Sequence, residues 1–187
     1  NKSRKTLIMK KVIIFGGTGF IGTSVAKYIS SKGFYPIVIG RTKTNESFKF
    51  VKWDGMNAGE WEGELNNAFA IINLVGKSVD CIKTPKNIDE ILKSRVDATL
   101  LIGKALRKAN SPPKIWIQMS TAHIYGDSET RINHEDSTLG YGLAPFVGKK
   151  WEAAFHASAL SDTRKVLLRT GFVLDKSGGA FTKLKQI

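Results

Sequence analysis

The chain has 187 residues, of which 42% are hydrophobic and 24% are charged, a balance that suits one folded domain and excludes a largely disordered chain. Its one cysteine, Cys81, excludes an internal disulfide framework and a CxxC site, and three scattered histidines make no zinc pattern. The formal net charge is +13, but beyond the first eleven residues the basic side chains are mixed with acidic ones. That mixture favours a solvated surface, so we expect no specific nucleic-acid partner.

The hydrophobic segments carry no signal for membrane insertion or export. No apolar run is long enough to span a bilayer, so we expect no membrane partner. Residues 12–15 are too few for the core of a signal peptide, which indicates a cytoplasmic protein. We expect residues 1–9 to be a basic extension or a tag remnant, and residues 10–187 to form one domain. The oligomeric state stays open, with a homodimer as one option.

Short apolar runs alternate with amphipathic segments along the chain. In chain order, the pattern predicts strands at residues 12–15, 35–39, 48–53, 70–75, 115–120 and 166–170. It predicts a helix from Phe20 to just before Gly33, a second that begins at Pro85, and a third over residues 146–160. Thr84 offers a capping hydroxyl in front of Pro85. Strands separated by helices predict an α/β fold: a Rossmann-type doubly wound parallel sheet with helices on both faces.

A glycine-rich segment, residues 15–22 (FGGTGFIG), follows the first predicted strand and opens the first helix. In this setting Gly16 permits a tight turn, Gly19 lets the backbone approach a pyrophosphate, and Gly22 lets the helix pack close to the strand. The helix start also offers free N–H groups to phosphates. A turn without a ligand is the alternative, but a simple turn does not need three glycines at this spacing. The predicted cofactor-binding residues here are Gly16, Thr18, Gly19, Phe20, Ile21 and Gly22.

The residue that follows the second strand bears on the choice of cofactor. A free ribose 2′-hydroxyl usually meets an acidic residue at this place, whereas a 2′-phosphate usually meets an arginine. The sequence has Arg41 and no acid there, with Lys43 close behind. We therefore predict NADP as the cofactor, with NAD as the alternative. The competing interpretation is that Arg41 is an ordinary surface loop residue.

Several motifs together resemble a known family. Residues 16–22 (GGTGFIG), 73–76 (NLVG) and 120–126 (STAHIYG) resemble those of the extended short-chain dehydrogenases/reductases. Three further motifs are similar to an atypical branch described as nucleoside-diphosphate-sugar epimerases: residues 94–96 (SRV), 150–152 (KWE) and 168–171 (LRTG). The likeness extends from about residue 10 to residue 184. It implies an NAD(P)-binding epimerase, dehydratase or reductase whose substrate is a nucleotide sugar or another small carbonyl compound.

The resemblance also implies roles for particular residues. Family members use a Ser/Thr, Tyr and Lys set for proton transfer beside the nicotinamide, which places the hydroxyl at Thr121 and the lysine at Lys150. Lys150 would also hold the nicotinamide ribose. The backbone of Leu74, Val75 and Gly76 is expected to line the cofactor, and Asp54 is expected to meet the adenine. From the residues alone, Thr121 ends a buried strand at its carboxyl edge, and capping of that strand end is the alternative role.

The tyrosine of the family's Tyr-x-x-x-Lys pair is missing. Counting back four residues from Lys150 gives Phe146, and a gapped alignment gives Ala144 instead. Phenylalanine has no proton to exchange, so the usual proton transfer is in doubt. Tyr141 is the nearest substitute in the sequence. A non-catalytic regulator that senses NADP(H) or binds a nucleotide sugar is therefore a second hypothesis. The family binds substrate largely through later segments, so we expect the C-terminal substrate lobe to be missing or truncated.

Overall fold

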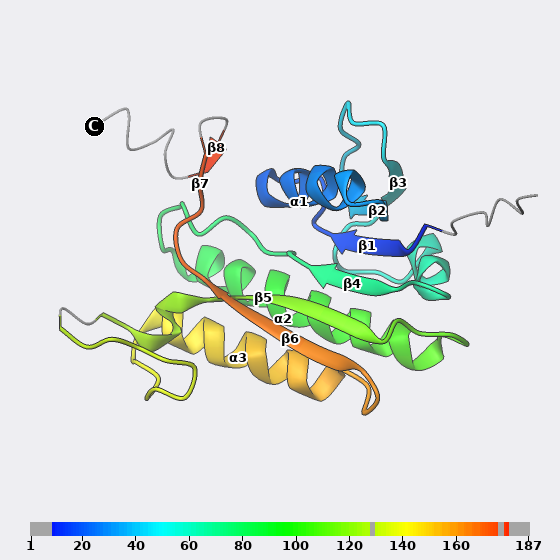
Figure 1. The fold of residues 1–187 in the computed structure, drawn as a ribbon. Helices are drawn as coiled ribbons and strands as arrows, with labels where there is room; N and C mark the ends of the chain where they lie inside the picture. Colours follow the sequence, from blue (N-terminus) through cyan, green and yellow to red (C-terminus); the bar gives the residue numbers. More distant parts are fainter. Residues whose placement is uncertain (1–8, 128–129, 176–177, 180–187) are drawn as a thin grey trace, which may run out of the picture.

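Six parallel strands form one sheet in the computed structural model, which describes residues 9–127, 130–175 and 178–179. The strands stand in the order β3-β2-β1-β4-β5-β6 (Figure 1). They are β1 (Lys11–Phe15), β2 (Tyr35–Gly40), β3 (Lys49–Lys52), β4 (Ala70–Asn73), β5 (Ile115–Thr121) and β6 (Arg164–Thr170). A separate antiparallel pair, β7 (Leu174–Asp175) and β8 (Gly178–Gly179), follows. The strand order is that of the Rossmann fold, which confirms the predicted sheet.

Within the described residues, three α-helices cover both faces of the sheet. The helix α1 (Phe20–Ser31) lies on one face, while α2 (Pro85–Lys108) and α3 (Leu143–Ser158) run side by side on the other (Figure 1). Two short 3-10 helices, η1 (Glu60–Leu65) and η2 (Ala122–Tyr125), follow β3 and β5. The prediction of helices on both faces is therefore confirmed.

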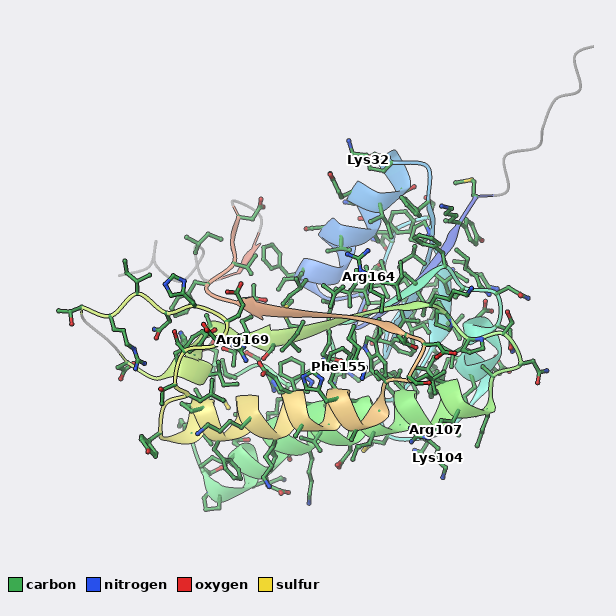
Figure 2. All side chains as sticks on the ribbon, turned by 60° about the horizontal axis from the view of Figure 1, so that its bottom comes forward. Lys32, Lys104, Arg107, Phe155, Arg164 and Arg169 are labelled. Atoms are coloured by element: carbon green, nitrogen blue, oxygen red, sulfur yellow. The ribbon has the colours of Figure 1, made fainter. Side chains whose placement is uncertain are left out.

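The strand β1 shows how the sequence builds two cores. Its side chains alternate between the faces of the sheet. Ile13 and Phe15 join the core under α2 and α3, which includes the fully buried Phe155 (Figure 2). Val12 and Ile14 pack on the opposite face, where the core includes a residue of α1. A strand buried on both faces needs apolar residues at every position, which explains the run VIIF.

Two element boundaries differ from the sequence prediction in ways that affect the site. The helix α3 begins at Leu143, three residues before the predicted start at 146, because Gly142 takes a φ of 98° ahead of it. Pro145 then lies in the first turn, where a helix does not need its N–H. The strand β4 ends at Asn73 and not at residue 75, since the side chain of Asn73 accepts a hydrogen bond from the Val75 N–H (3.1 Å).

The centre of the sheet brings two loops together at the carboxyl ends of the strands. The chain leaves β1 for α1 on one face, and leaves β4 for α2 on the other face. Open α/β sheets bind ligands at such a switch point. The loop after β1 and the turn at residues 74–76 are in contact there, because a Cβ at Gly16 would lie 3.1 Å from the Leu74 backbone. The fold thus places the candidate site between β1 and β4.

Candidate functional site

The glycine loop is tied to both neighbouring strands. Gly16 has a φ of +74°, which an L side chain rarely adopts, and a Cβ there would crowd the Leu74 backbone at 3.1 Å. The N–H groups of Gly16 and Gly17 both donate to the Ile39 carbonyl, at 2.9 and 3.1 Å. Gly16 therefore makes the tight turn that its position in the sequence predicts. The turn fixes the loop between the ends of β2 and β4.

Gly22 and Gly19 are required for different reasons. A Cβ at Gly22 would lie 2.4 Å from the Gly16 carbonyl oxygen and 2.5 Å from the Gly17 Cα, so a glycine is needed there for the helix to approach the loop. A Cβ at Gly19 would meet only the Gly16 oxygen, at an ordinary 3.4 Å. Gly19 is exposed and precedes the first turn of α1. The packing of the described residues therefore does not demand a glycine at position 19.

The start of α1 presents unpaired backbone donors beside this exposed glycine. Phe20 and Ile21 are the first residues of the helix, so their N–H groups have no carbonyl four residues back within the helix. The positive end of the helix dipole lies at the same point, and the first turn contains no acidic side chain. This arrangement suits an anionic group.

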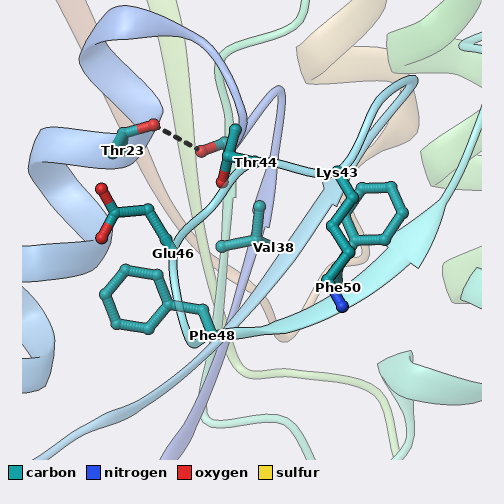
Figure 3. Close-up of a pocket in the computed structure, with 8 residues that line it drawn as sticks. Thr23, Val38, Lys43, Thr44, Glu46, Phe48 and Phe50 are labelled. Carbon is teal, nitrogen blue, oxygen red and sulfur yellow. Dashed lines mark hydrogen bonds between the residues drawn. The ribbon is translucent and has the colours of Figure 1, made fainter.

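Thr18 links the loop to the end of β2. A Cβ at Gly40 would lie 2.5 Å from the Thr18 hydroxyl oxygen, so Thr18 packs directly against Gly40. The next residue, Arg41, is exposed. Lys43 lines a narrow cleft together with Gly17, Thr23, Val38, Thr44, Glu46, Phe48 and Phe50 (Figure 3). Lys43 thus shares a cleft with Gly17 of the glycine loop, and Arg41 follows β2 as an exposed residue. Glu46, in the same cleft, is paired with Lys27 at 2.7 Å.

Asp54 uses its carboxylate to build a local turn. One oxygen accepts hydrogen bonds from the N–H groups of Met56 (2.8 Å) and Asn57 (2.9 Å), and the other accepts from the Asn57 side chain (2.6 Å). These bonds, led by that of the Asn57 side chain, lower the pKa of Asp54 from 3.8 to about 2. The structure thus gives Asp54 a turn-forming role, and its expected contact with adenine stays a prediction.

The turn after β4 rests on a buried polar network. Asn73, Thr99 and Gln118 are all fully buried. The Asn73 amide donates to Thr99 Oγ1 (3.1 Å) and to Gln118 Oε1 (3.0 Å), while its oxygen accepts from the Val75 N–H. Satisfied networks of this kind rigidify a core. The backbone at Leu74, Val75 and Gly76 is therefore held in place from below.

Thr121 stands at the carboxyl end of β5, and its hydroxyl oxygen accepts a hydrogen bond from the His123 N–H (3.2 Å). That contact makes it the N-cap of η2, which is the alternative role that the sequence left open. The hydroxyl proton is not used in this bond, so capping and proton donation are compatible.

A charged network that the sequence did not reveal begins at Ser120, the residue before Thr121. Glu152 of α3 accepts hydrogen bonds from the Ser120 hydroxyl (2.6 Å) and from Arg169 Nε (3.0 Å) and Nη2 (2.9 Å). Arg169, labelled in Figure 2, also donates to the Tyr125 hydroxyl (2.6 Å) and the Glu135 carbonyl (2.6 Å). The hydrogen bond with the Glu152 carboxylate raises the pKa of Arg169. This network joins β5, β6, η2 and α3 near the end of β5, where the predicted catalytic threonine stands.

Phe146 and Lys150 lie one turn apart on α3, the spacing that a Tyr-x-x-x-Lys pair requires. Both are exposed, Phe146 to 47%. Tyr141, the candidate substitute, is 93% exposed and its ring contacts Lys149 rather than Lys150. Tyr141 lines a pocket of about 350 Å³ together with Tyr125, Gly126, Asp127, Arg131, Thr138, Leu139 and Gly140. The structure therefore does not join Tyr141 to Thr121 and Lys150 in one pocket.

The described part of the chain contains neither a candidate metal site nor a helix that could span a membrane. No group of three or more His, Cys, Asp or Glu side chains is arranged to hold a metal ion there. Within the same residues, no helix combines the length and the apolar character needed to cross a bilayer.

A parallel six-stranded sheet with a GGTGFIG turn at its switch point defines a Rossmann-type domain. Residues 12–170 match the NAD dependent epimerase/dehydratase family, and the chain belongs to that family. The resemblance inferred from the motifs is therefore confirmed.

Among the relatives is the human epimerase family protein SDR39U1, which is 32% identical over 174 residues, covering 91% of this chain and 57% of the human protein. A crystal structure of human SDR39U1 (isoform 2) with NADPH has a TM-score of 0.82 at 30% identity, covering 94% of this chain and 58% of that one. A nucleoside-diphosphate sugar epimerase from Corynebacterium glutamicum has a TM-score of 0.78 at 24% identity, covering 95% and 37%, and shares the fold. The chain thus spans little more than half the length of the human relative.

Proposed function

We propose that this chain binds NADP(H) at the carboxyl edge of the sheet and forms the cofactor-binding domain of an NADP-dependent epimerase, dehydratase or reductase. NAD is the alternative cofactor. The observation that carries the proposal is the unfilled space at Gly19, where the protein's packing would admit a side chain. A pyrophosphate at the start of α1 accounts for that glycine. The NADPH-bound structure of the human relative supports the same assignment.

Each part of the glycine loop has a role in this proposal. The N–H groups of Phe20 and Ile21, at the start of the helix, donate to the phosphate oxygens. Thr18 holds the loop against Gly40, which keeps the neighbouring Arg41 beside the ligand. The Arg41 guanidinium, with its forked donors, binds the 2′-phosphate.

On the other side of β1, the turn at residues 74–76 lines the cofactor with its backbone. Asn73 supports that turn from the buried network beneath it. Asp54 is proposed to meet the adenine through the face of its turn that remains exposed.

The chemical step depends on residues at the ends of β5 and α3. A bound nicotinamide supplies or takes a hydride. In this chain Lys150 holds the ribose and Thr121 offers a hydroxyl proton, but Phe146 offers none. An isolated threonine hydroxyl is a weak acid and a weak base without an activating partner. We therefore expect slow proton transfer unless Tyr141 moves toward Thr121.

Phe146 is also the observation that favours a second function. A protein that keeps the cofactor site and lacks the proton donor can serve as a non-catalytic sensor of NADP(H) or a binder of nucleotide sugars. Measurable cofactor binding without turnover on any carbonyl substrate would support this regulator.

We make further proposals for the second ligand, the domain organisation, the location and the oligomeric state. The second ligand is a small molecule, a nucleotide sugar or another carbonyl compound, and no specific nucleic acid is expected. Residues 10–187 are proposed as one domain in a cytoplasmic protein, with substrate recognition completed by a C-terminal lobe. A homodimer is the oligomeric state to test.

The cofactor preference can be tested by calorimetric titration of the chain with NADPH and NADH. Arg41→Ala removes a charge-assisted contact worth about 1.5–3 kcal/mol, so NADPH affinity should fall roughly 10- to 150-fold. NADH affinity should stay nearly unchanged. Arg164→Ala, which removes another exposed arginine at the start of β6, is the matched control and should change neither value. Equal wild-type affinity for the two cofactors would refute the assignment of Arg41.

A further inference from the structure

One arginine of α2 reaches the candidate site without a carboxylate partner. Arg95 makes one hydrogen bond, from Nη1 to the Ile91 carbonyl one turn earlier (3.0 Å). Its guanidinium carbon lies 5.1 Å from the centre of the Trp151 ring, a cation–π contact. Among the described residues, no carboxylate lies within 4.0 Å of it, and neither Nε nor Nη2 donates a hydrogen bond.

The guanidinium lies against the turn that follows β4. A Cβ at Gly76 would be 2.9 Å from the guanidinium carbon of Arg95, 3.1 Å from Nη2 and 3.2 Å from Nε. Gly76 therefore makes room for Arg95. The same turn contacts the glycine loop at Gly16, and Trp151 follows Lys150 on α3. Arg95 thus lies between the turn at residues 74–76 and the helix α3, which carries the predicted catalytic lysine.

An unpaired charge that is partly buried costs desolvation free energy. Arg95 is partly buried, which lowers the pKa of its guanidinium, and no acidic side chain offsets this effect. Arg169 shows the usual solution, because the two oxygens of Glu152 pair with two of its nitrogens. A desolvated cation without a counter-charge is normally paired, neutralised or replaced. A ligand that brings the negative charge would resolve the cost at Arg95.

We propose that Arg95 is an anion-binding residue at the inner side of the site, where Nε and Nη2 donate to a phosphate or carboxylate oxygen of a bound ligand. The proposal deepens the proposed function, on which it rests for the identity of the ligand. The oxygen belongs either to the NADP(H) phosphates or to the second ligand. The forked donors of arginine suit both groups.

The first arm of the test measures NADPH binding by calorimetry. If the dinucleotide supplies the oxygen, Arg95→Met should weaken NADPH binding roughly 10- to 100-fold, because a charge-assisted hydrogen bond is lost. Arg107→Met is the matched control. It removes an arginine of the same helix about 18 Å away, toward the amino ends of the strands (Figure 2). The Arg107→Met variant should bind NADPH like the wild type.

The second arm follows the Arg95 Nε–H signal by NMR in the wild-type chain, assigned by its absence in Arg95→Lys. The chain is saturated with NADPH and titrated with inorganic phosphate and then with acetate. If the second ligand supplies the oxygen, one of these anions should shift the signal, while Arg95→Met binds NADPH normally. If the dinucleotide supplies it, neither anion should shift the signal in the saturated chain.

The proposal fails if Arg95→Met leaves NADPH affinity unchanged and neither anion shifts the Arg95 signal. Thermal melting identifies a Met variant that does not fold, and Arg95→Lys then replaces it, with a smaller expected loss of NADPH affinity because the charge remains. If the wild-type chain does not bind NADPH at all, the proposed function is wrong. The anion titration of the free chain then decides the role of Arg95 by itself.

Discussion

Removal of the Glu152 carboxylate should destabilise the chain far more than removal of an exposed one. The Glu152 and Arg169 side chains are only 10% and 19% exposed, and they share two hydrogen bonds. Glu152→Ala would leave Arg169 charged and largely buried without its partner. Breaking a buried pair in this way costs about 3–5 kcal/mol. We expect the lower end, about 3 kcal/mol, because Arg169 keeps its bonds to Tyr125 and Glu135.

The assay is urea unfolding of the wild type and variants, with the midpoint and slope both measured. Asp89→Ala is the matched control, since Asp89 pairs with Lys93 at the same 2.9 Å distance but both side chains are more than half exposed. An exposed helix pair of this kind contributes about 0.3–0.5 kcal/mol. A double-mutant cycle of Glu152→Ala with Arg169→Leu should show strong coupling. If Glu152→Ala costs no more than Asp89→Ala, the network does not hold the site together.

Two further predictions concern chemistry and pH. The wild type should oxidise NADPH slowly with carbonyl substrates, and Phe146→Tyr should raise that rate by roughly tenfold or more, because a positioned acid typically contributes 10²–10⁴-fold. Phe69→Tyr is the control, because it adds a phenol just before β4, at the amino ends of the strands. Fast wild-type turnover would contradict the expectation. Asp54 has its pKa lowered to about 2, so its carboxylate stabilises the fold above pH 3.8 and loses this effect as pH falls toward 2. The stability gap between wild type and Asp54→Ala should therefore close between about pH 4 and 2, and a gap that does not change with pH would show that the ionised carboxylate is unimportant.

The sequence predicted the sheet because its central strands β1, β2 and β4 are short, apolar and buried at nearly every position. A run such as VIIF in β1 has few other interpretations. The glycine loop was predicted for a similar reason, since the backbone of Gly16 and the packing of Gly22 restrict what other residues could stand there. The start of α3 was predicted at residue 146 but lies at Leu143, and Pro145 stands in the first turn of the helix.

The side-chain partnerships at the site could not be read from the sequence. Glu152 and Arg169 occur in two separate motifs, and only the crossing of α3 under β5 and β6 brings them together. Arg95 belongs to the motif at residues 94–96, but the sequence predicted no role for it. Its meeting with Gly76 and Trp151 depends on where the turn after β4 and the helix α3 lie. Local patterns predict elements, whereas these pairings depend on tertiary packing.

The most direct test of the account is calorimetric titration of the wild-type chain and Gly19→Val with NADPH. Gly19 has room for a side chain within the protein, so Gly19→Val should melt near the wild-type temperature. Its side chain would occupy the space assigned to the pyrophosphate, so it should show no measurable binding where the wild type binds. Gly63→Val is the matched control, because a Cβ at Gly63 meets nothing within 4 Å, and it should bind normally. A folded Gly19→Val variant that binds NADPH as tightly as the wild type would contradict the central claim.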